Sequence, residues 1–470
     1  MRAALLAALA LLGAGCARLG DEAERAGASE AAVRPNVLLL IVDDLRPEVG
    51  IYGADIETPH IDALAEAGVR FDQHRVNVPV CGPSRATLLA GVRGTEGRFL
   101  RFDARADAQA PLAEPLPAFF RRHGYAAYSL GKVLHDPADH AAAWSAPPWQ
   151  PDVPHLSKNY VVPRNRAMQA REGVTGPATE AAAVPDDAYV DGMIAARAEA
   201  VLDTLGQDGR PFLLAVGFLR PHLPFAVPQR YWNETPEGDL PADRAWPRDA
   251  PRDGRYVTGE LLKYAGLPEA TPFDEGIVRR LRRGYRASVR YVDAQVGRVL
   301  AALEASGQAD DTVVVLWGDH GFLLGEHGLW AKHVTLDLAL RSPLIVRGPG
   351  VARGAASGLV ETVDVYPTLA ALAGLPAPDH AQGQSVLPLL RDPSAPGKPA
   401  VFSRFRAMET VTTPTHALTL FADAPGGPFA DSMLFDHRTD PAESRNVMAE
   451  QPDAAARLSR MLRAHLAERE

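Results

Sequence analysis

Residues 36–44 read Asn-Val-Leu-Leu-Leu-Ile-Val-Asp-Asp, and this stretch decides the fold class. Its apolar part, residues 37–42, contains only Val, Leu and Ile, which is typical of a strand buried on both faces of a parallel sheet. Two aspartates, Asp43 and Asp44, follow directly. The stretch therefore predicts a sheet covered on both sides, with acidic side chains at the carboxyl end of one strand.

The same order, a short apolar run followed by polar residues, recurs along the chain. It predicts strands at 126–130, 212–218, 312–317 and 344–346, and helical patterns predict helices at 61–67, 116–123, 188–205, 273–306 and 363–373. This alternation predicts the α/β class, with a large, mainly parallel sheet flanked by helices. In such sheets the site forms outside the carboxyl ends of the strands, where polar residues follow each run.

The N-terminal residues resemble an export signal. Residues 1–16 join Met-Arg to an Ala/Leu stretch that is too short to span a bilayer. The small residues before Cys16 resemble a bacterial lipobox, which implies cleavage there and a lipid on the Cys16 sulfur. The alternative is later cleavage and plain secretion. We therefore expect an exported protein, either a periplasmic or outer-membrane lipoprotein or a secreted one.

Composition divides the rest of the chain into three parts. Residues 17–33 lack apolar periodicity and predict a flexible tether. Residues 34–395 are predicted to form the main domain, in which the Pro-rich segments 144–185 and 224–272 wall the site at the strand ends and set what it binds. Residues 396–470 are predicted to form a small antiparallel sheet, closed by a helix at 454–466.

Charge and cysteine content limit the function. The 470 residues include 58 acidic and 49 basic side chains, a net charge of −9, so no broad basic surface attracts nucleic acid. Cys16 and Cys81 are the only cysteines. If Cys16 is lipidated or removed, Cys81 has no disulfide partner. Because an unpaired thiol is a liability in an oxidising compartment, a chemical role for Cys81 is favoured.

Cys81 heads the pentapeptide Cys81-Gly82-Pro83-Ser84-Arg85. Pro83 is favoured in the first turn of a helix, so Cys81 is expected at the helix start. Free backbone amides there favour negative charge, and can lower a thiol pKa or receive an oxyanion such as a sulfate ester. Taken alone, such a cysteine is more often a small buried residue.

The pentapeptide resembles, at every fixed position, the Cys-x-Pro-x-Arg sequence that the formylglycine-generating enzyme recognises in type I sulfatases. Further motifs extend the resemblance: Asp43-Asp44-Leu45-Arg46-Pro47, Gly131-Lys132-Val133-Leu134-His135, Pro221-His222-Leu223-Pro224, Gly318-Asp319-His320-Gly321 and Trp330-Ala331-Lys332. The chain most resembles the iduronate 2-sulfatase branch. This implies an alkaline-phosphatase-like fold and the hydrolysis of a sulfate ester, on a sulfated carbohydrate, with release of inorganic sulfate.

The resemblance also implies a metal site at Asp43, Asp44, Asp319, His320 and the modified residue 81. Strand-end carboxylates that share one crevice cannot all stay charged without a cation between them, and hard oxygen ligands suit Ca²⁺ or Mg²⁺. The family implies Ca²⁺. His320 departs from the Asn of many sulfatases, and imidazole is a poor Ca²⁺ ligand. The alternative is that the Asp43-Asp44 pair merely caps a turn.

The remaining predicted site residues are cationic or exchange protons. Formylglycine made from Cys81 would attack sulfur as its hydrate, His222 would protonate the leaving alcohol, and His135 would deprotonate the second hydroxyl. Lys132 and Lys332 would hold sulfate oxygens, and Arg85 would orient residue 81. We interpret other residues as ordering a loop (Glu326, His327 and His333) or as surface and helix-end residues (His60, His74 and His123).

Two other function classes stay open. A phosphate or phosphonate ester hydrolase of the same superfamily would share the metal site and the modified cysteine. A surface glycan-binding lipoprotein with a calcium site would not need the complete Cys-x-Pro-x-Arg sequence. The sequence leaves the sulfated sugar, its linkage and the oligomeric state open.

Overall fold

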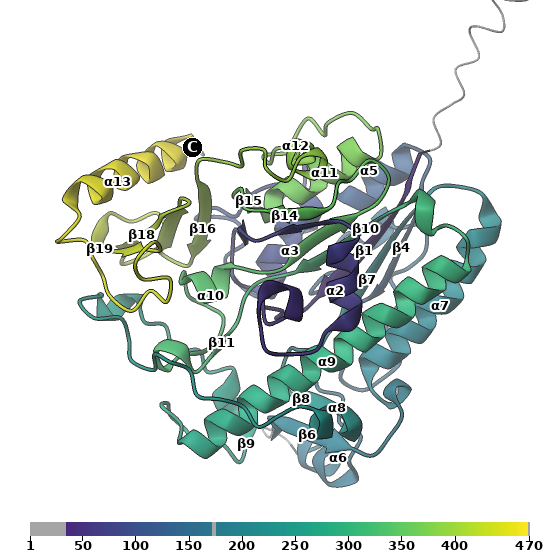
Figure 1. The fold of residues 1–470 in the computed structure, drawn as a ribbon, viewed down its shortest axis with the longest axis horizontal. Coiled ribbons are helices and arrows are strands. Elements are labelled where there is room, and N and C mark those ends of the chain that lie inside the picture. The colour runs from purple at the N-terminus through teal and green to yellow at the C-terminus, as the bar shows by residue number, and fades with distance from the viewer. Residues whose placement is uncertain (1–33, 172–174, 469–470) are drawn as a thin grey trace, which may run out of the picture. The chain divides into compact units, whose positions relative to one another are not determined.

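Strand β1 (Asn36–Val42) lies inside a seven-stranded sheet (Figure 1). The structure, a computed structural model, describes residues 34–171 and 175–468. The expected export signal, tether and lipid-anchor residue Cys16 lie outside the described residues. The strand order of the sheet is β14 (Gly354–Ala356), β2 (Val69–Phe71), β13 (Leu344–Arg347), β10 (Thr312–Gly318), β1, β7 (Phe212–Phe218) and β4 (Ala126–Gly131).

The side chains of β1 alternate between two hydrophobic cores, one on each face of the sheet. Leu38 and Leu40 belong to one core, and Leu39 and Ile41 to the other; all four are fully buried. A continuous apolar run is therefore required, because neither face of this strand meets water. The predicted strand buried on both faces is confirmed.

Helices cover both faces of the sheet (Figure 1). The first core includes side chains of α2 (Pro59–Glu66), α7 (Val190–Asp208) and α9 (Glu275–Ala305). The second includes side chains of α3 (Cys81–Ala90), α5 (Leu116–Arg122), α11 (Val365–Leu372) and α12 (Leu387–Arg391). The α/β class, the flanking helices and the helices expected at these positions are confirmed.

Strand β13 is antiparallel to both of its neighbours, β10 and β2, whereas β10, β1, β7 and β4 are mutually parallel. The only α-helix in the segment that joins β10 to β13, all of which the structure describes, is the four-residue α10 (Asp337–Leu340), so no long helix returns the chain to the opposite end of the sheet. The sheet is mixed but mainly parallel. The short strands β2 and β14 were not expected from the sequence.

The C-terminal region forms the expected antiparallel sheet. Its strands are β16 (Val401–Phe405), β17 (Met408–Thr412), β18 (His416–Ala422) and β19 (Phe429–Asp436), followed by α13 (Pro452–Ala467). Leu418 and Leu434 pack against Leu458 of α13. Phe405 and Phe435 belong to a separate cluster with Val80, the residue before Cys81. This sheet therefore reaches the region of the cysteine.

The two long Pro-rich segments pair with each other. Strands β5 (Thr175–Pro177) and β6 (Thr179–Ala182) of the first pair in parallel with β9 (Tyr264–Ala265) and β8 (Phe225–Pro228) of the second. The same segments carry the short helices α6 (Pro163–Gln169) and α8 (Gln229–Glu234). The remaining short elements are β3 (His74–Arg75), α4 (Ala106–Gln109), β11 (Leu323–Leu324), β12 (Trp330–Ala331) and β15 (Val360–Glu361).

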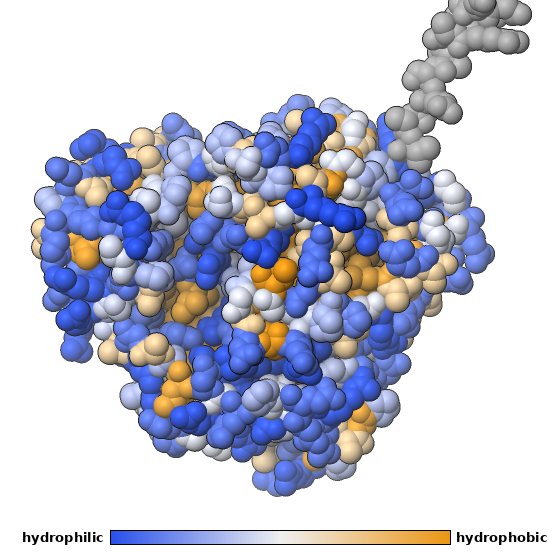
Figure 2. All heavy atoms as spheres, viewed as in Figure 1, coloured by the Kyte–Doolittle hydropathy of each residue, from blue (hydrophilic) through white to orange (hydrophobic). Residues whose placement is uncertain are grey.

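The face shown in Figure 2 is mainly hydrophilic, with small and separate hydrophobic patches. Among the described residues, no helix combines the length and apolar character needed to cross a membrane.

Candidate active site

Acidic and imidazole side chains meet at the carboxyl ends of β1 and β10. Asp43 follows β1, and Asp319 and His320 follow β10, while Cys81 is the first residue of α3. One ligand atom from each of these four buried residues lies within 4.8 Å of the others. Because β1 and β10 are adjacent and parallel, their carboxyl ends place these residues together.

Asp44 joins the same cluster. Its backbone amide donates to Asp319 Oδ1 at 3.0 Å, and its Oδ1 lies 3.4 Å from His320 Nε2. The residue has φ of 60°, a left-handed conformation that non-glycine residues adopt infrequently. The Tyr285 hydroxyl, from α9, donates to the Asp44 carbonyl at 2.8 Å and helps to hold this turn.

The hydrogen bonds of His320 define which ring nitrogen faces the cluster. Nδ1 lies 2.9 Å from the Gly321 carbonyl, to which it can only donate. In a neutral ring Nε2 then carries the lone pair, and this nitrogen lies 3.3 Å from Cys81 Sγ. The carboxylate oxygen Asp43 Oδ1 is buried, and its ion-pair contact with Arg85 Nη2 at 3.2 Å lacks hydrogen-bond geometry. Carboxylate oxygens with one available imidazole nitrogen fit a divalent cation.

Arg85 links the carboxylates to one another. Its Nε donates to Asp319 Oδ2 at 2.8 Å, and its Nη2 lies 3.2 Å from Asp43 Oδ1. Its Nη1 donates to the backbone carbonyls of Lys132 and Val133. The sequence analysis expected Arg85 to orient residue 81 directly. With Cys81 unmodified, the guanidinium contacts the aspartates and the two backbone carbonyls, and its role toward a modified residue 81 stays a prediction.

Two buried lysines each pair with one aspartate. Lys132 Nζ bonds Asp43 Oδ2, and Lys332 Nζ lies 2.9 Å from Asp44 Oδ1. Burial favours the neutral amine, but the partner carboxylates outweigh it and raise the pKa of both lysines. Burial also opposes the charge of Asp43, yet Lys132 and Arg85 hold the pKa of this carboxyl well below its usual range. The buried lysines and aspartates of the site therefore form pairs of opposite charge.

Glu260 is a site residue that the sequence analysis missed. Its Oε1 lies 3.1 Å from Lys332 Nζ and 3.3 Å from His222 Nε2. Lys332 and His222 hold the pKa of this carboxyl well below its usual value, although burial acts in the opposite direction. Glu260 belongs to the second Pro-rich segment and no motif surrounds it, so only its contacts identify it.

His222 and His135 differ in their hydrogen-bonding environments. His222 Nδ1 lies 2.6 Å from the Leu223 carbonyl, and its Nε2 faces Glu260, so both ring nitrogens face acceptors. In this arrangement each ring nitrogen can donate a hydrogen bond. His135 Nδ1 is buried without a partner, and burial together with Lys132 lowers the pKa of His135 to about 3. His135 is therefore neutral near pH 7.

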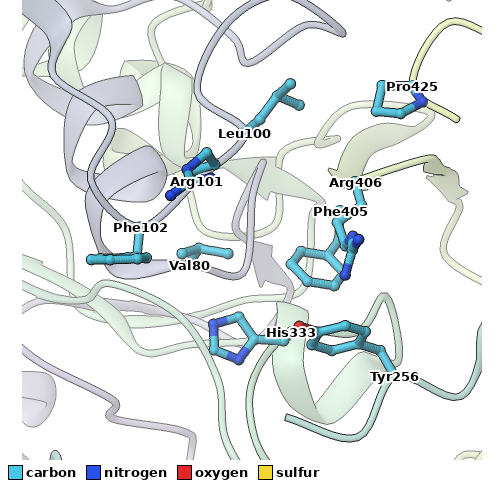
Figure 3. A pocket seen from close by; sticks show the side chains of 9 residues that line it. All are labelled: Val80, Leu100, Arg101, Phe102, Tyr256, His333, Phe405, Arg406 and Pro425. Atoms are coloured by element: carbon cyan, nitrogen blue, oxygen red, sulfur yellow. The ribbon is translucent and has the colours of Figure 1, made fainter. Parts of the chain in front are cut away.

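A cavity of about 440 Å³ is lined by residues that adjoin the site in sequence. Figure 3 shows the side chains that line it. Three of its lining residues are connected to the site. Val80 precedes Cys81, His333 follows Lys332, and the Phe102 ring lies 5.8 Å from the His135 ring. A Cβ atom at Gly82 would lie 2.1 Å from the Phe102 carbonyl oxygen, so only glycine permits this approach. The lining residues are Val80, Leu100, Arg101, Phe102, Tyr256, His333, Phe405, Arg406 and Pro425.

Comparison with known proteins identifies the family. The sulfatase family model matches residues 35–375, and the model described as N-sulphoglucosamine sulphohydrolase, C-terminal, matches residues 325–470. The chain belongs to the sulfatase family. As a member it is a sulfuric ester hydrolase.

Named relatives of this sulfatase match most of its length. Iduronate 2-sulfatase of Mus musculus is 32% identical over 78% of this chain and 73% of the relative. Choline-sulfatase of Rhizobium meliloti is 30% identical over 76% and 72% of the two chains. The fold is shared with a solved 2-O GAG sulfatase, with a TM-score of 0.72, 23% identity and coverage of 93% and 92%. These comparisons confirm the resemblance and the alkaline-phosphatase-like fold.

A solved phosphonate monoester hydrolase of Agrobacterium radiobacter is also similar to this sulfatase. The two chains are 26% identical with a TM-score of 0.76, and the match covers 92% of this chain and 96% of the hydrolase. The shared framework therefore extends to an enzyme with a different named activity.

The structure alters two expectations about individual residues of the sulfatase. Burial, reinforced by the Asp43 carboxylate, raises the pKa of the Cys81 thiol well above its ordinary value, so the helix start does not lower it. His74 was expected at the surface or a helix end. It is fully buried, and its Nδ1 lies 3.1 Å from the Ser342 carbonyl, because β3 pairs through Arg75 with Arg341, just before β13.

The loop that follows β10 contains residues with different roles. Glu326 accepts from Arg46 and Arg282 and from the Leu324 amide, which orders the loop as expected. His327 is buried and lies against the Ala245 carbonyl. His333 instead lines the cavity, and its buried Nδ1 has no hydrogen-bond partner. Loop ordering therefore does not account for His333.

Proposed function

We propose that this sulfatase hydrolyses a sulfate ester on a sulfated carbohydrate, using the hydrate of a formylglycine made from Cys81 as the nucleophile. One observation carries the proposal. Cys81 combines its place at the head of Cys-x-Pro-x-Arg with a position 3.3 Å from His320, inside the cluster with Asp43 and Asp319. A buried thiol with a raised pKa is a poor nucleophile, which favours a modified residue 81.

Maturation replaces the Cys81 thiol with an aldehyde. The side-chain carbon loses its sulfur as sulfide, gains an oxygen and gives two electrons to the oxidant used by the maturation enzyme. Addition of water to the aldehyde then supplies two hydroxyls on one carbon. Unmodified serine would offer only one, so release of the sulfated intermediate would need water to attack sulfur.

The predicted metal ligands are Asp43, Asp44, Asp319 and His320, together with residue 81. Their oxygens and the available His320 Nε2 suit Ca²⁺ or Mg²⁺, and Arg85 orients two of the carboxylates. When bound, the cation neutralises the aspartates and withdraws negative charge from the sulfate group.

Lys132 and Lys332 supply positive charge at the site. They pair with Asp43 and Asp44. Both can bind sulfate oxygens once the carboxylates have another counter-ion, and fixed cations in a buried site stabilise the charge that develops during S–O cleavage. Lys332 is also held by Glu260 at 3.1 Å, which orients its ammonium group.

The two histidines divide the proton transfers. One hydrate hydroxyl gives its proton to Asp319 and bonds to sulfur while the bond between sulfur and the sugar oxygen breaks. The sugar oxygen takes a proton from His222. The environment of His222, with acceptors at both nitrogens, supports the acid role. The second hydroxyl then gives its proton to the neutral His135. The carbon–oxygen bond to sulfate breaks, the aldehyde re-forms, and water restores the hydrate.

The test is turnover of an aryl sulfate by protein co-expressed with a maturation enzyme. We expect sulfate release, a Cys81 peptide whose mass corresponds to the aldehyde, and loss of turnover in Cys81→Ala. Chelation should abolish turnover, and Ca²⁺ or Mg²⁺ should restore it. A Cys81→Ala protein that retains the wild-type rate would exclude residue 81 as the nucleophile.

A second candidate function is phosphonate ester hydrolysis. It is favoured by the 26% identity and TM-score of 0.76 to the phosphonate monoester hydrolase. Phenyl phosphonate and phenyl sulfate esters with the same leaving group separate the two functions. A higher kcat/KM for the phosphonate would support the second function over the first.

The sulfated carbohydrate is supported by the relatives named iduronate 2-sulfatase, which are 30% to 32% identical to this chain. An exported location is consistent with this substrate, with a lipid on Cys16 as one form of attachment. Replacing Cys16 with Ala should abolish incorporation of labelled fatty acid if this residue is the anchor, while secretion without lipid would leave no label in the wild type.

A further inference from the structure

The cavity beside Cys81 carries positive charge on two separate parts of the chain. Arg101 lies between α3 and α4, and Arg406 lies in the turn between β16 and β17. In the view of Figure 3 they stand on opposite sides of the cavity. None of the described residues that line the cavity is acidic. This contrasts with the net charge of −9 for the whole chain.

The guanidinium groups are available to a ligand. Arg406 lies 5.0 Å above the ring of Tyr256, and within the described part of the chain no carboxylate pairs with it. Arg101 pairs with Asp103 at 3.2 Å, but both side chains are more than half exposed, so solvent weakens this pair. An oxyanion that enters the cavity can replace such a weak partner.

Aromatic side chains line the same cavity. Phe102, Tyr256 and Phe405 contribute their rings. Of the large hydrophobic side chains that the structure describes, three are exposed; Phe102 is one, and Val257, next to Tyr256, is another. Exposed apolar side chains beside a cavity indicate a binding surface. Aromatic rings beside charged groups match a sugar, which has apolar ring faces and anionic substituents.

We propose that Arg101 and Arg406 are specificity-determining residues that bind a second oxyanion on the substrate, either a carboxylate or another sulfate. The proposal rests on the proposed function, because the first sulfate is taken to sit at residue 81. It makes the preferred substrate a polyanionic sugar. Arginine forms two parallel hydrogen bonds with either oxyanion, so the charge and geometry of both groups fit.

The experiment compares three sulfated disaccharides that share the cleavable sulfate. One carries a uronate carboxylate, one has this group reduced to an alcohol, and one carries a second sulfate in place of the carboxylate. The variants are Arg101→Ala, Arg406→Ala and the double change, with Arg353→Ala as the matched control. Arg353 is exposed and does not line the cavity. An aryl sulfate measures turnover without a second oxyanion.

We expect each cavity variant to lower kcat/KM for the dianionic disaccharides about tenfold to a hundredfold, mainly through KM. The aryl sulfate, the reduced disaccharide and the control variant should change little. The preference should also weaken as salt is added. Comparing the carboxylate with the second sulfate identifies the oxyanion that is bound.

The proposal is overturned if the double variant keeps the wild-type preference for a dianionic substrate. Binding to Cys81→Ala protein, measured by calorimetry, separates this failure from failure of the proposed function. Arginine-dependent binding without hydrolysis by the mature wild type would support the cavity's role and reject the sulfatase mechanism. If the mature protein hydrolyses the aryl sulfate but binds the disaccharide equally well without the two arginines, the sulfatase mechanism is supported and the role of the cavity is rejected.

Discussion

Replacing Arg85 with Met tests whether the buried charges are interdependent. The guanidinium is fully buried and contacts Asp319 at 2.8 Å and Asp43 at 3.2 Å. Its removal takes a positively charged partner from the two buried carboxylates of Asp43 and Asp319, so their negative charge is no longer fully compensated. Removing one partner of a buried pair costs about 3–5 kcal/mol, so we expect a loss of this size in the free energy of unfolding.

Urea denaturation of the unmodified cysteine form, in chelator at pH 8, measures this loss. Arg122→Met is the control, because Arg122 and Glu114 form an exposed pair, and we expect its midpoint to stay unchanged. Adding Asp319→Asn to Arg85→Met should recover part of the loss by removing one uncompensated charge.

The pH dependence of Arg85→Met has a definite sign. Burial already raises the pKa of Asp319, and loss of Arg85 raises it further. The folded variant then binds more protons than the unfolded chain, so its stability should increase as the pH falls from 8 to 5. The reasoning would be refuted if Arg85→Met were as stable as wild type at pH 8. It would also be refuted if adding Asp319→Asn to Arg85→Met lowered the stability further.

Two further predictions concern titratable residues. Because the pKa of His135 is about 3, the residue stays neutral between pH 5 and 8, so His135→Ala should lower kcat about 10²- to 10⁴-fold throughout this range. A pH-rate profile in which only the acid limb changes would contradict this. Arg46 and Arg282 overcome burial and lower the pKa of Glu326 to about 2 from 4.5, which corresponds to about 3 kcal/mol of stability above pH 5. The difference in unfolding free energy between wild type and Glu326→Gln should therefore shrink as the pH falls from 5 to 3, and a constant difference would exclude the ionic contribution.

Much of the fold was accessible from local patterns. The apolar run before Asp43 predicts a strand buried on both faces, and the alternation of side chains between two cores explains why the pattern is continuous. The direction of β13 was not accessible in this way. The same sequence can form a parallel or an antiparallel strand. Which of the two forms depends on the path of the segment that connects the strand to its neighbour.

The sequence by itself determined the family and the α/β class and predicted a set of candidate site residues, because these depend on motifs and on polar residues that directly follow strands. Only the tertiary structure placed Glu260 against His222 and Lys332, since its segment carries no periodic pattern and its course depends on packing with distant parts of the chain. The same holds for Arg406, which the C-terminal sheet brings to the cavity beside Cys81. Charge pairing within the site is likewise a tertiary property, because the partners come from separate elements and the pKa of each group depends on burial and on the charges around it.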